Sequence, residues 1–301
     1  MKLAITGATG FVGGHLLDQA LAAGHEVRAL TRRPQNSRDD VTWIEGALDR
    51  SDSLDRLAEG TEAVIHVAGV INAPDKAGFE AGNVAGTAAI LDAAEQAGVK
   101  RFVHVSSLAA REPGLSLYGA SKARSETLVE AAKLPSVIVR PPAVYGPGDH
   151  EMLELFRMAK RGFVLLPPRG RLAVIHAEDL ARLLLTAAAS DSPEGTTIEP
   201  DDGRPGGWSH EEFGKALGRA VGREVVTIST PRALLRAGAL IDGLVRRRRA
   251  KLTSDRVAYF CHPDWTIASA RAVSPTLWKP AIDTEKGLAD TAGWYRAKGW
   301  L

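Results

Sequence analysis

The stretch Thr6-Gly7-Ala8-Thr9-Gly10-Phe11-Val12-Gly13 stands between an apolar run at residues 2–6 and an alanine- and leucine-rich segment at residues 11–23. These flanking patterns predict a β-strand and an α-helix, so the glycines fall in the turn between them. Glycine permits a tight turn and lets backbone N–H groups approach a pyrophosphate at the helix N-terminus. The stretch therefore predicts a dinucleotide-binding turn. The alternative is a glycine turn that only packs the helix on the strand.

Outward from this turn, the first part of the chain alternates short apolar runs with helical patterns, which is typical of βαβ units and a parallel sheet. Right-handed crossovers place such helices on both faces of the sheet. We therefore expect an α/β fold with a Rossmann-type doubly wound sheet. The expected strands are Lys2–Thr6, Glu26–Thr31, Val41–Glu45 and residues 63–67, 101–106, 137–140 and 196–199, and the expected helices include residues 11–23, 86–97 and 178–189.

The composition of the sequence changes after Pro141, where paired prolines and glycine-rich turns become frequent. We expect a smaller C-terminal cap over the carboxyl ends of the strands, where open α/β sheets bind ligands. The predicted dinucleotide-binding domain comprises residues 1–146 and 173–200, and the predicted substrate-binding cap comprises residues 147–172 and 201–301. The aromatic residues that either line an apolar pocket or form the core of the cap are Trp208, Tyr259, Phe260, Trp265 and Trp278.

The composition of the whole chain excludes several classes of protein. With 301 residues the chain has room for one large or two moderate domains, and its formal charge of +2 gives no argument for nucleic acid. The single cysteine, Cys261, excludes an internal disulfide framework and has no ligand cluster around it for a metal. No apolar run is long enough to span a membrane, and the chain opens on a strand pattern without a signal peptide. We expect a cytoplasmic protein that binds no metal.

The end of the second predicted strand bears on the choice of cofactor. A dinucleotide fold that prefers NAD usually places an acidic residue on the adenosine ribose about 20 residues after the turn. Here the strand ends in Arg32 and Arg33, with no acid beside them. Two guanidinium groups suit a 2′-phosphate, so the sequence favours NADP(H), with NAD left open. The alternative is a pair of solvated loop arginines.

A second motif, Tyr118-Gly119-Ala120-Ser121-Lys122, follows the serine pair Ser106-Ser107. A tyrosine and a lysine four residues apart lie on one face of a helix, one turn from each other. An ammonium close to a phenol lowers the pKa of the phenol, so that the hydroxyl exchanges a proton near neutral pH. Carbonyl reduction and alcohol oxidation need such a group on oxygen while a hydride moves at carbon.

Together these motifs resemble the extended short-chain dehydrogenase/reductases, which include dihydroflavonol reductases, 3β-hydroxysteroid dehydrogenases and nucleotide-sugar epimerases. The resemblance covers residues 1 to about 185 and implies a Rossmann fold with oxidoreductase activity. The other motifs that carry it are Val64-Ile65-His66-Val67-Ala68-Gly69, Asn83-Val84-Ala85-Gly86-Thr87, Arg140-Pro141-Pro142-Ala143-Val144-Tyr145-Gly146-Pro147 and Ile175-His176-Ala177-Glu178-Asp179-Leu180-Ala181.

The resemblance implies a role for each matched residue. Tyr118 would be the general acid/base, Lys122 would lower its pKa and hold the nicotinamide ribose, Ser107 would hold the substrate oxygen, and Asn83 would support the lysine. The implied cofactor-binding residues are Gly7, Thr9, Gly10, Phe11, Val12, Gly13, Arg32, Arg33, Leu48, Ala68, Gly69, Tyr118, Lys122, Pro141 and Val144. The alternative, non-catalytic interpretations are that Ser107 is a strand-end serine, that Asn83 caps a helix, and that Tyr118 and Lys122 are an exposed helical pair.

Two features depart from the pattern of the family. The family often places an aspartate for adenine after the third strand, but Gly46-Ala47-Leu48-Asp49 has alanine in that slot, so the anchor falls to the backbone or to Asp49. Only ten residues separate Ser107 from Tyr118, fewer than in the epimerases and steroid enzymes. This spacing resembles an atypical branch related to a mitochondrial complex I accessory subunit, some of whose members bind NADP without known catalysis.

The sequence therefore predicts an NADP(H)-dependent oxidoreductase that interconverts a ketone and a secondary alcohol on a mostly apolar small molecule. One alternative is a nucleotide-sugar epimerase or dehydratase, disfavoured because the segment after Ser107 lacks an acidic pair. Another is a non-catalytic NADP-binding subunit or redox sensor. The expected partner is a small molecule rather than nucleic acid, and the chain is expected to be a monomer or a homodimer.

An arginine run, Arg246-Arg247-Arg248-Arg249, follows an apolar helical stretch at residues 233–245. The sequence favours a solvated basic end of a helix, where cations complement the helix dipole. Contact of this run with the anionic surface of a membrane is the disfavoured alternative.

Overall fold

The computed structural model describes residues 1–189, 195–246 and 253–301, and these form two compact units. The first unit consists of Met1–Pro141, Leu180–Glu199 and Arg271–Trp278, and the second of Pro142–Asp179, Pro200–Ala270 and Lys279–Leu301. Residues 142–146 and 173–179 therefore pack with the second unit and residues 271–278 with the first, unlike the predicted boundaries. The assignment of the units as a cofactor domain and a cap stays a prediction.

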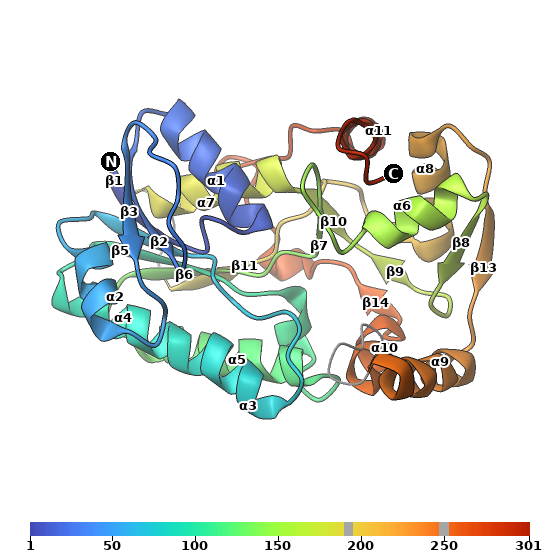
Figure 1. Cartoon of the computed structure of the whole chain (residues 1–301), viewed down its shortest axis with the longest axis horizontal. Coiled ribbons are helices and arrows are strands. Elements are labelled where there is room, and N and C mark those ends of the chain that lie inside the picture. The colour runs from blue at the N-terminus through green and yellow to red at the C-terminus, as the bar shows by residue number, and fades with distance from the viewer. Residues whose placement is uncertain (190–194, 247–252) are drawn as a thin grey trace. The chain divides into compact units, whose positions relative to one another are not determined.

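A seven-stranded parallel sheet forms the centre of the first unit, in the order β11-β6-β5-β4-β1-β2-β3 (Figure 1). The α/β fold with a Rossmann-type sheet is thus confirmed. Because β1 pairs with β2 on one side and with β4 on the other, the strand order reverses at β1, which is where such sheets bind dinucleotides. The strands are β1 (Lys2–Thr6), β2 (Glu26–Thr31), β3 (Val41–Glu45), β4 (Ala63–His66), β5 (Arg101–Val105), β6 (Ser136–Val139) and β11 (Thr196–Ile198).

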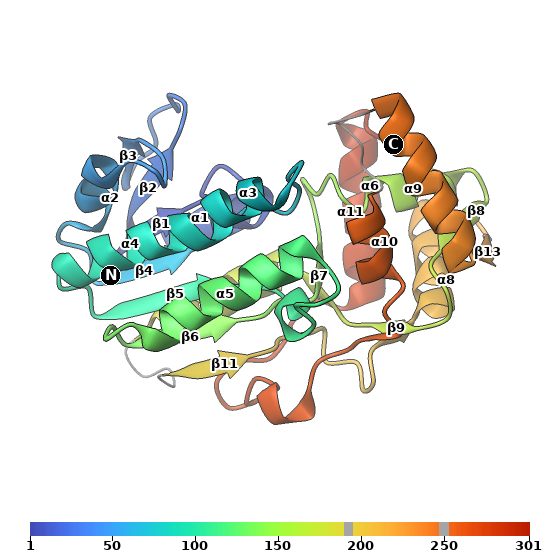
Figure 2. The ribbon, with the colours of Figure 1, turned by 90° about the horizontal axis from the view of Figure 1, so that it is seen from below.

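Helices cover both faces of this sheet (Figure 1). One face carries α1 (Phe11–Ala22) and α7 (Ala177–Ala188). On the other, α2 (Ser51–Ala58), α4 (Gly86–Gln96) and α5 (Leu117–Ala131) bury apolar side chains, and Figure 2 shows α4 beside α5. The core between this layer and the sheet includes Leu54, Leu57, Ile90, Val64, Phe102 and Ile138.

Three short helical segments connect the larger elements of the first unit. After β4 the chain forms α3 (Lys76–Phe79) and then a π-helical turn, η1 (Glu80–Ala85), which runs directly into α4. After β5 it forms a 3₁₀ turn, η2 (Leu108–Arg111), which occupies most of the short loop before α5. A Cβ on Gly119 would lie 2.5 Å from the carbonyl oxygen of Ala109, so the first turn of α5 packs directly on η2.

The second unit is built from short strand pairs and helices around an aromatic core. Its helices are α6 (Leu153–Lys160), α8 (His210–Val221), α9 (Arg232–Arg246), α10 (Ser254–Phe260) and α11 (Thr284–Ala297). Its strands are β7 (Ala143–Tyr145), β8 (Phe163–Leu166), β9 (Arg171–Leu172), β10 (Val174–His176), β12 (Trp208–Ser209), β13 (Val226–Ser229) and β14 (Asp264–Trp265). The segment Ser269–Arg271 forms a further 3₁₀ turn.

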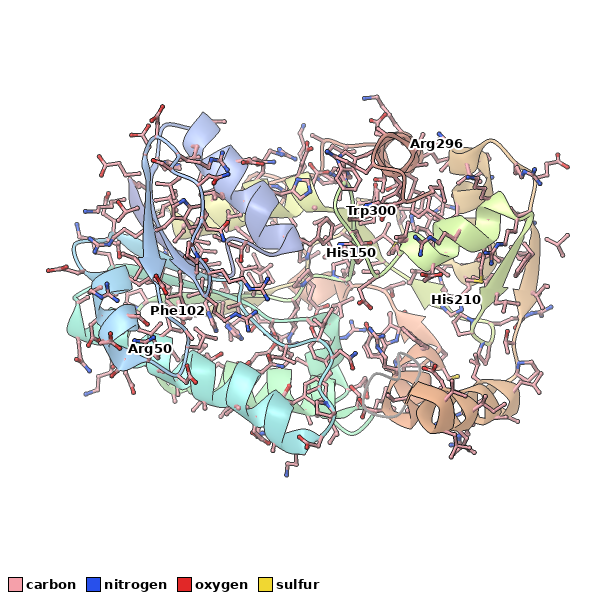
Figure 3. All side chains as sticks on the ribbon, in the orientation of Figure 1. Arg50, Phe102, His150, His210, Arg296 and Trp300 are labelled. Atoms are coloured by element: carbon pink, nitrogen blue, oxygen red, sulfur yellow. The ribbon has the colours of Figure 1, made fainter. Side chains whose placement is uncertain are left out.

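Aromatic residues of the second unit pack mainly on one another. The core includes Tyr145, Phe156, Trp208, Phe213 and Tyr295. At its edge His150 stacks on Trp300, with 4.2 Å between ring centroids (Figure 3). Of the two roles predicted for Trp208, lining an apolar pocket or packing in a core, the structure supports packing in the core.

Trp278 departs from the predicted division, since it lies in the first unit, where the Arg182 guanidinium stands 5.9 Å from its ring centroid.

Within the described ranges, no helix is both long enough and apolar enough to cross a membrane. In the same ranges, no group of His, Cys, Asp and Glu side chains is suited to hold a metal ion. Of the arginine run, Arg247, Arg248 and Arg249 fall outside the described residues, and Arg246 is the last residue of α9.

Candidate functional site

The glycine-rich turn joins β1 to α1 with little room for side chains. Gly7 has φ +77°, and a Cβ on it would lie 2.8 Å from the backbone nitrogen of Ala68. A Cβ on Gly13 would lie 2.0 Å from the carbonyl oxygen of Gly7, so α1 packs tightly against the turn. Thr9 and Gly10 are exposed, and no described side chain caps the first turn of α1. The N–H groups in the first turn of α1 therefore suit an anionic pyrophosphate.

The neighbouring strand ends carry the other predicted cofactor residues of the first unit. Arg32 and Arg33 follow β2 and are exposed. Their exposure is compatible with binding a 2′-phosphate and also with two solvated loop arginines. Leu48 packs against α4, since a Cβ on Gly86 would lie 2.7 Å from Leu48 Cδ1. At the end of β4, the Ala68 N–H donates to Thr6 Oγ1 at 3.2 Å. Their roles toward a cofactor stay predictions.

Asn83 ties the loop after β4 to helix α5. Its amide nitrogen donates to the Val70 carbonyl and to Ser121 Oγ, both at 2.9 Å, and its oxygen accepts from the Val70 N–H at 2.6 Å. The Asn83 side chain lies 3.1 Å from the position of a Cβ on Gly69, and Lys122 Nζ lies 3.9 Å from the same position. Asn83 thus lies beside Lys122 and does not act as a side-chain cap of α4.

Ser107, Tyr118 and Lys122 meet where β5 ends and α5 begins. The Ser107 side chain is hydrogen-bonded to the hydroxyl of Tyr118 and also accepts from the Ala109 N–H at 3.2 Å. Lys122 lies one turn further along α5, is buried, and donates to the Val105 carbonyl at 2.7 Å. The reading as an exposed helical pair is therefore wrong.

Comparison of the sequence with known proteins identifies the family of the chain. Residues 3–199 match the model of the NAD dependent epimerase/dehydratase family. The chain belongs to this family. Membership and the named relatives place it among the NAD(P)-dependent oxidoreductases and epimerases.

The relatives of this family member differ in how much of the chain they share. A ceramide reductase of Caulobacter vibrioides (strain NA1000 / CB15N) is 41% identical over 312 residues, covering 99% of this chain and 96% of the relative. A putative dihydroflavonol 4-reductase of Synechocystis sp. is 34% identical over 171 residues, covering 48% of this chain and 50% of the relative. The Bordetella bronchiseptica enzyme WbmG, solved with NAD and UDP, has a TM-score of 0.76 at 19% identity over 100% of this chain and 96% of WbmG, which shows a common fold.

The lowered pKa expected for Tyr118 in this epimerase/dehydratase-family chain is not found. Burial raises the pKa of Tyr118, and the hydrogen bond with Ser107 only partly offsets that rise. The Lys122 ammonium is directed to the Val105 carbonyl. Burial lowers the pKa of Lys122 to about 8, although the carboxylate of Glu126 acts in the opposite direction. For the Tyr118 hydroxyl, desolvation therefore outweighs the hydrogen bond with Ser107.

A buried ion network below the site was missed by the sequence analysis. Glu126 accepts from Ser106 Oγ at 2.5 Å and from two guanidinium nitrogens of Arg140 at 2.8 and 2.6 Å. Arg140 also contacts Glu199 at 3.4 Å, and Arg111 contacts the other oxygen of Glu199 at 3.2 Å. Ser106 is thus engaged with Glu126, which leaves Ser107 as the serine beside Tyr118. No local pattern in the sequence indicates this network, because Glu126 and Arg140 come from different elements, as do Glu199 and Arg111.

Two neutral histidines also lie beneath the site and were not among the predicted residues. His66 and His104 are fully buried, and their rings stack with 5.5 Å between centroids. Burial and the nearby Lys122 charge lower the pKa of His66 to about 3 and that of His104 well below its ordinary value. Neither ring therefore carries a positive charge next to Lys122 at neutral pH.

Pro141 and Val144, predicted to border the nicotinamide, fall in different units. Pro141 is buried in the first unit and its carbonyl accepts from the Leu108 N–H at 3.1 Å. Val144 lies in β7 and pairs with Ile175 of β10 within the second unit. Their predicted role toward the cofactor stays a prediction.

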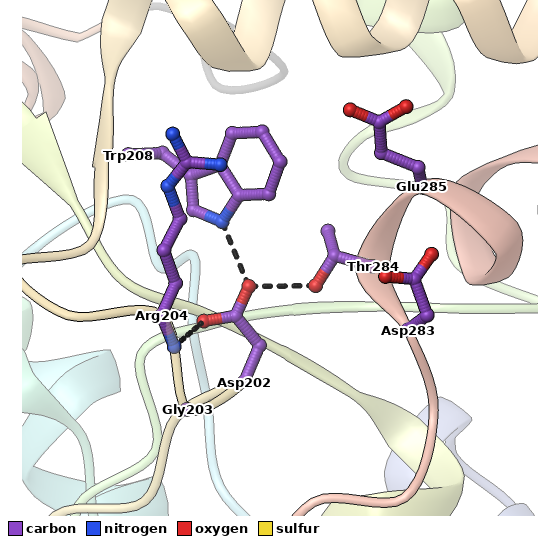
Figure 4. Close-up of a pocket in the computed structure, with 7 residues that line it drawn as sticks. All are labelled: Asp202, Gly203, Arg204, Trp208, Asp283, Thr284 and Glu285. Atoms are coloured by element: carbon purple, nitrogen blue, oxygen red, sulfur yellow. Dashed lines mark hydrogen bonds between the residues drawn. The ribbon is translucent and has the colours of Figure 1, made fainter.

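A hollow in the second unit has polar walls that are paired among themselves (Figure 4). The carboxylate of Asp202 accepts from Trp208 Nε1 at 2.7 Å and from Thr284 Oγ1 at 2.6 Å. The Arg204 guanidinium lies over the Trp208 ring, 3.9 Å from its centroid. These groups hold the second unit together, so the hollow is not a second candidate site.

Proposed function

We propose that this chain is an NADP(H)-dependent reductase that interconverts a ketone and a secondary alcohol on a long-chain, mostly apolar lipid. The hydrogen-bonded pair of Ser107 and Tyr118, with Lys122 one helical turn away, is the observation that carries the proposal. A relative named ceramide reductase, similar over nearly the whole chain, supports the lipid class of the substrate.

The chemistry of the proposal divides between the cofactor and three side chains. A bound nicotinamide supplies the hydride that the carbonyl carbon receives. Ser107 and Tyr118 donate hydrogen bonds to the carbonyl oxygen and polarise it. The Tyr118 proton then passes to that oxygen, and the resulting phenolate is stabilised by Ser107 and by the nearby Lys122 ammonium.

The burial of Lys122 fits this division of labour. With its pKa near 8, Lys122 still carries a charge at neutral pH and needs little further desolvation when substrate covers the site. Asn83, held between Val70 and Ser121, keeps the loop after β4 beside the lysine. Asn83 is therefore a positioning residue in this proposal.

The function is tested by following NADPH absorbance with the purified chain and a ceramide whose long-chain base carries a ketone, dispersed in detergent. We expect NADPH to be consumed and the matching alcohol to appear by mass spectrometry. UDP-glucose serves as the comparison substrate. Interconversion of UDP-sugars without reduction of the ketone would favour the epimerase alternative, and cofactor that co-purifies but is never consumed would favour a non-catalytic subunit.

Cofactor preference gives a separate prediction at the end of β2. Changing Arg32 and Arg33 together to serine is expected to raise the KM for NADPH about a hundredfold or more, because each charge-assisted hydrogen bond to a phosphate contributes about 1.5–3 kcal/mol and two are lost. The KM for NADH and both kcat values should change little. The control is Arg38→Ser, which removes an exposed arginine that pairs with Asp18 at 2.9 Å. Equal changes with NADPH and NADH would mean that the two arginines do not contact the 2′-phosphate.

A further inference from the structure

Helix α9 presents large apolar side chains to solvent in the second unit. Leu234, Leu240 and Ile241 are 62–66% exposed, and Leu244 and Val245 are 79% and 76% exposed. Single exposed apolar residues are common on protein surfaces, but a contiguous set on one element marks an interaction site. We call these five residues the α9 apolar face.

The apolar face has the spacing of one side of a helix. Leu234, Ile241 and Val245 are separated by seven and four residues, so they share a face, and Leu240 and Leu244 form the adjacent row. The buried Ala239 faces the other way, toward the interior. Helix α10 runs alongside α9, as Figure 1 shows. One side of α9 is thus packed in the unit and the opposite side has no cover among the described residues.

Arginines adjoin the apolar face. Arg232 and Arg236 are exposed and continue the same row, four residues apart, that ends in Leu240 and Leu244. The acidic residue of this helix, Asp242, is half-buried and so is not part of the exposed face. In the sequence, four arginines at positions 246–249 follow Val245. The apolar residues are therefore bracketed by positive charge.

We propose that the α9 apolar face docks on an anionic lipid surface, with Arg232 and Arg236 at the level of the headgroups. A helix with apolar residues on one side and arginines beside them lies in the plane of a membrane interface, and each basic residue near an anionic leaflet adds to the attraction. A second copy of the chain is disfavoured as the occupant, because the same arginines would face each other across a symmetric contact. The surface is argued from α9 alone and goes beyond the proposed function, whose lipid substrate such a surface would bring within reach.

The test is co-sedimentation of the full chain with vesicles of phosphatidylglycerol and phosphatidylcholine, compared with vesicles of phosphatidylcholine alone. We expect binding to the anionic vesicles at low salt and weaker binding at high salt. The triple variant Ile241→Ser, Leu244→Ser and Val245→Ser should reduce the bound fraction at least about tenfold, because burial of those side chains in the interface is lost. The pair Arg232→Gln and Arg236→Gln should weaken binding mainly at low salt.

The matched control changes exposed apolar residues elsewhere in the same unit. Leu165, Val226 and Ile228 lie on the paired strands β8 and β13 and are 44–67% exposed. Their serine variant should bind vesicles like the parent chain, and circular dichroism should show that both triple variants are folded. Equal vesicle binding by the α9 variant and the parent would overturn the proposal, as would a dimer in size-exclusion chromatography that only the α9 variant loses.

Turnover separates this proposal from the proposed function. The α9 variants should reduce a detergent-dispersed ketone at the parental rate, since α9 takes no part in the chemistry. Tyr118→Phe should bind anionic vesicles like the parent chain while losing turnover. Vesicle binding that survives in a chain without any reductase activity would support the docking surface and contradict only the function. A Tyr118→Phe chain that no longer binds vesicles would contradict the docking surface as an independent site.

Discussion

Changing Tyr118 to phenylalanine is expected to lower kcat for ketone reduction by about 10²–10⁴-fold, the usual contribution of a positioned general acid. The substitution removes the hydroxyl that is hydrogen-bonded to Ser107. It leaves the ring, whose centroid lies 6.3 Å from the ring centroid of Phe79. The dissociation constant for NADPH, measured by fluorescence titration, should change less than about threefold, because the turn at Gly7 to Gly13 is untouched.

The control for this variant is Tyr259→Phe, which removes a tyrosine hydroxyl from the second unit. The Tyr259 ring packs at a tilt against Trp265 with 4.6 Å between ring centroids, and this contact survives the change. The control should keep parental kcat. Parental turnover in Tyr118→Phe would exclude Tyr118 as the proton donor, and equal losses in both variants would point to damage of the fold.

Changing Glu126 to glutamine is expected to reduce the free energy of unfolding by about 3 kcal/mol. The side chains of Arg140 and Glu126 are only 12% and 5% exposed, and they are joined by two hydrogen bonds. Removing one partner of a buried pair costs about 3–5 kcal/mol because the other charge is left uncompensated. Glu199, at 3.4 Å from Arg140, offsets part of this cost. Urea unfolding followed by circular dichroism measures the loss.

The matched control is Glu80→Gln, which removes the same charge from an ion pair with Arg124 of α5. Those side chains are 34% and 41% exposed, so the loss should stay below about 1 kcal/mol. If both variants lose equal stability, the buried network contributes no more than an ordinary surface pair. Glu126→Gln should also shift the pKa of Lys122 further down, because the Glu126 carboxylate now raises it.

The sheet of the first unit was predictable because its strands are short, mainly apolar runs bounded by turns. Three of them, Ala63–His66, Arg101–Val105 and Ser136–Val139, are buried along their whole length. The predicted ends of two strands differ by one residue, since the paired residues end at His66 and Val105 and not at Val67 and Ser106. The grouping of Ser107, Tyr118 and Lys122 was also predictable, because helical spacing and a strand end define it.

The remaining features depend on tertiary contacts that no local pattern reports. Glu126, Arg140 and Glu199 come from a helix, a strand end and a strand far apart in the chain, and only the sheet order brings them together. The raised pKa of Tyr118 follows from burial, which the spacing of Tyr118 and Lys122 does not reveal. The strand pairs of the second unit are two to four residues long, too short for periodicity to show.

Tyr118, Lys122 and Glu126 form one row along α5, so the hydroxyl that we propose as the proton donor and the carboxylate that pairs with Arg140 belong to the same helix. A twist of α5 large enough to move the Tyr118 hydroxyl would also separate the Glu126 carboxylate from the Arg140 guanidinium. Under the proposed function, directed evolution toward new substrates should therefore leave α5 unchanged and vary the second unit, the predicted substrate-binding cap.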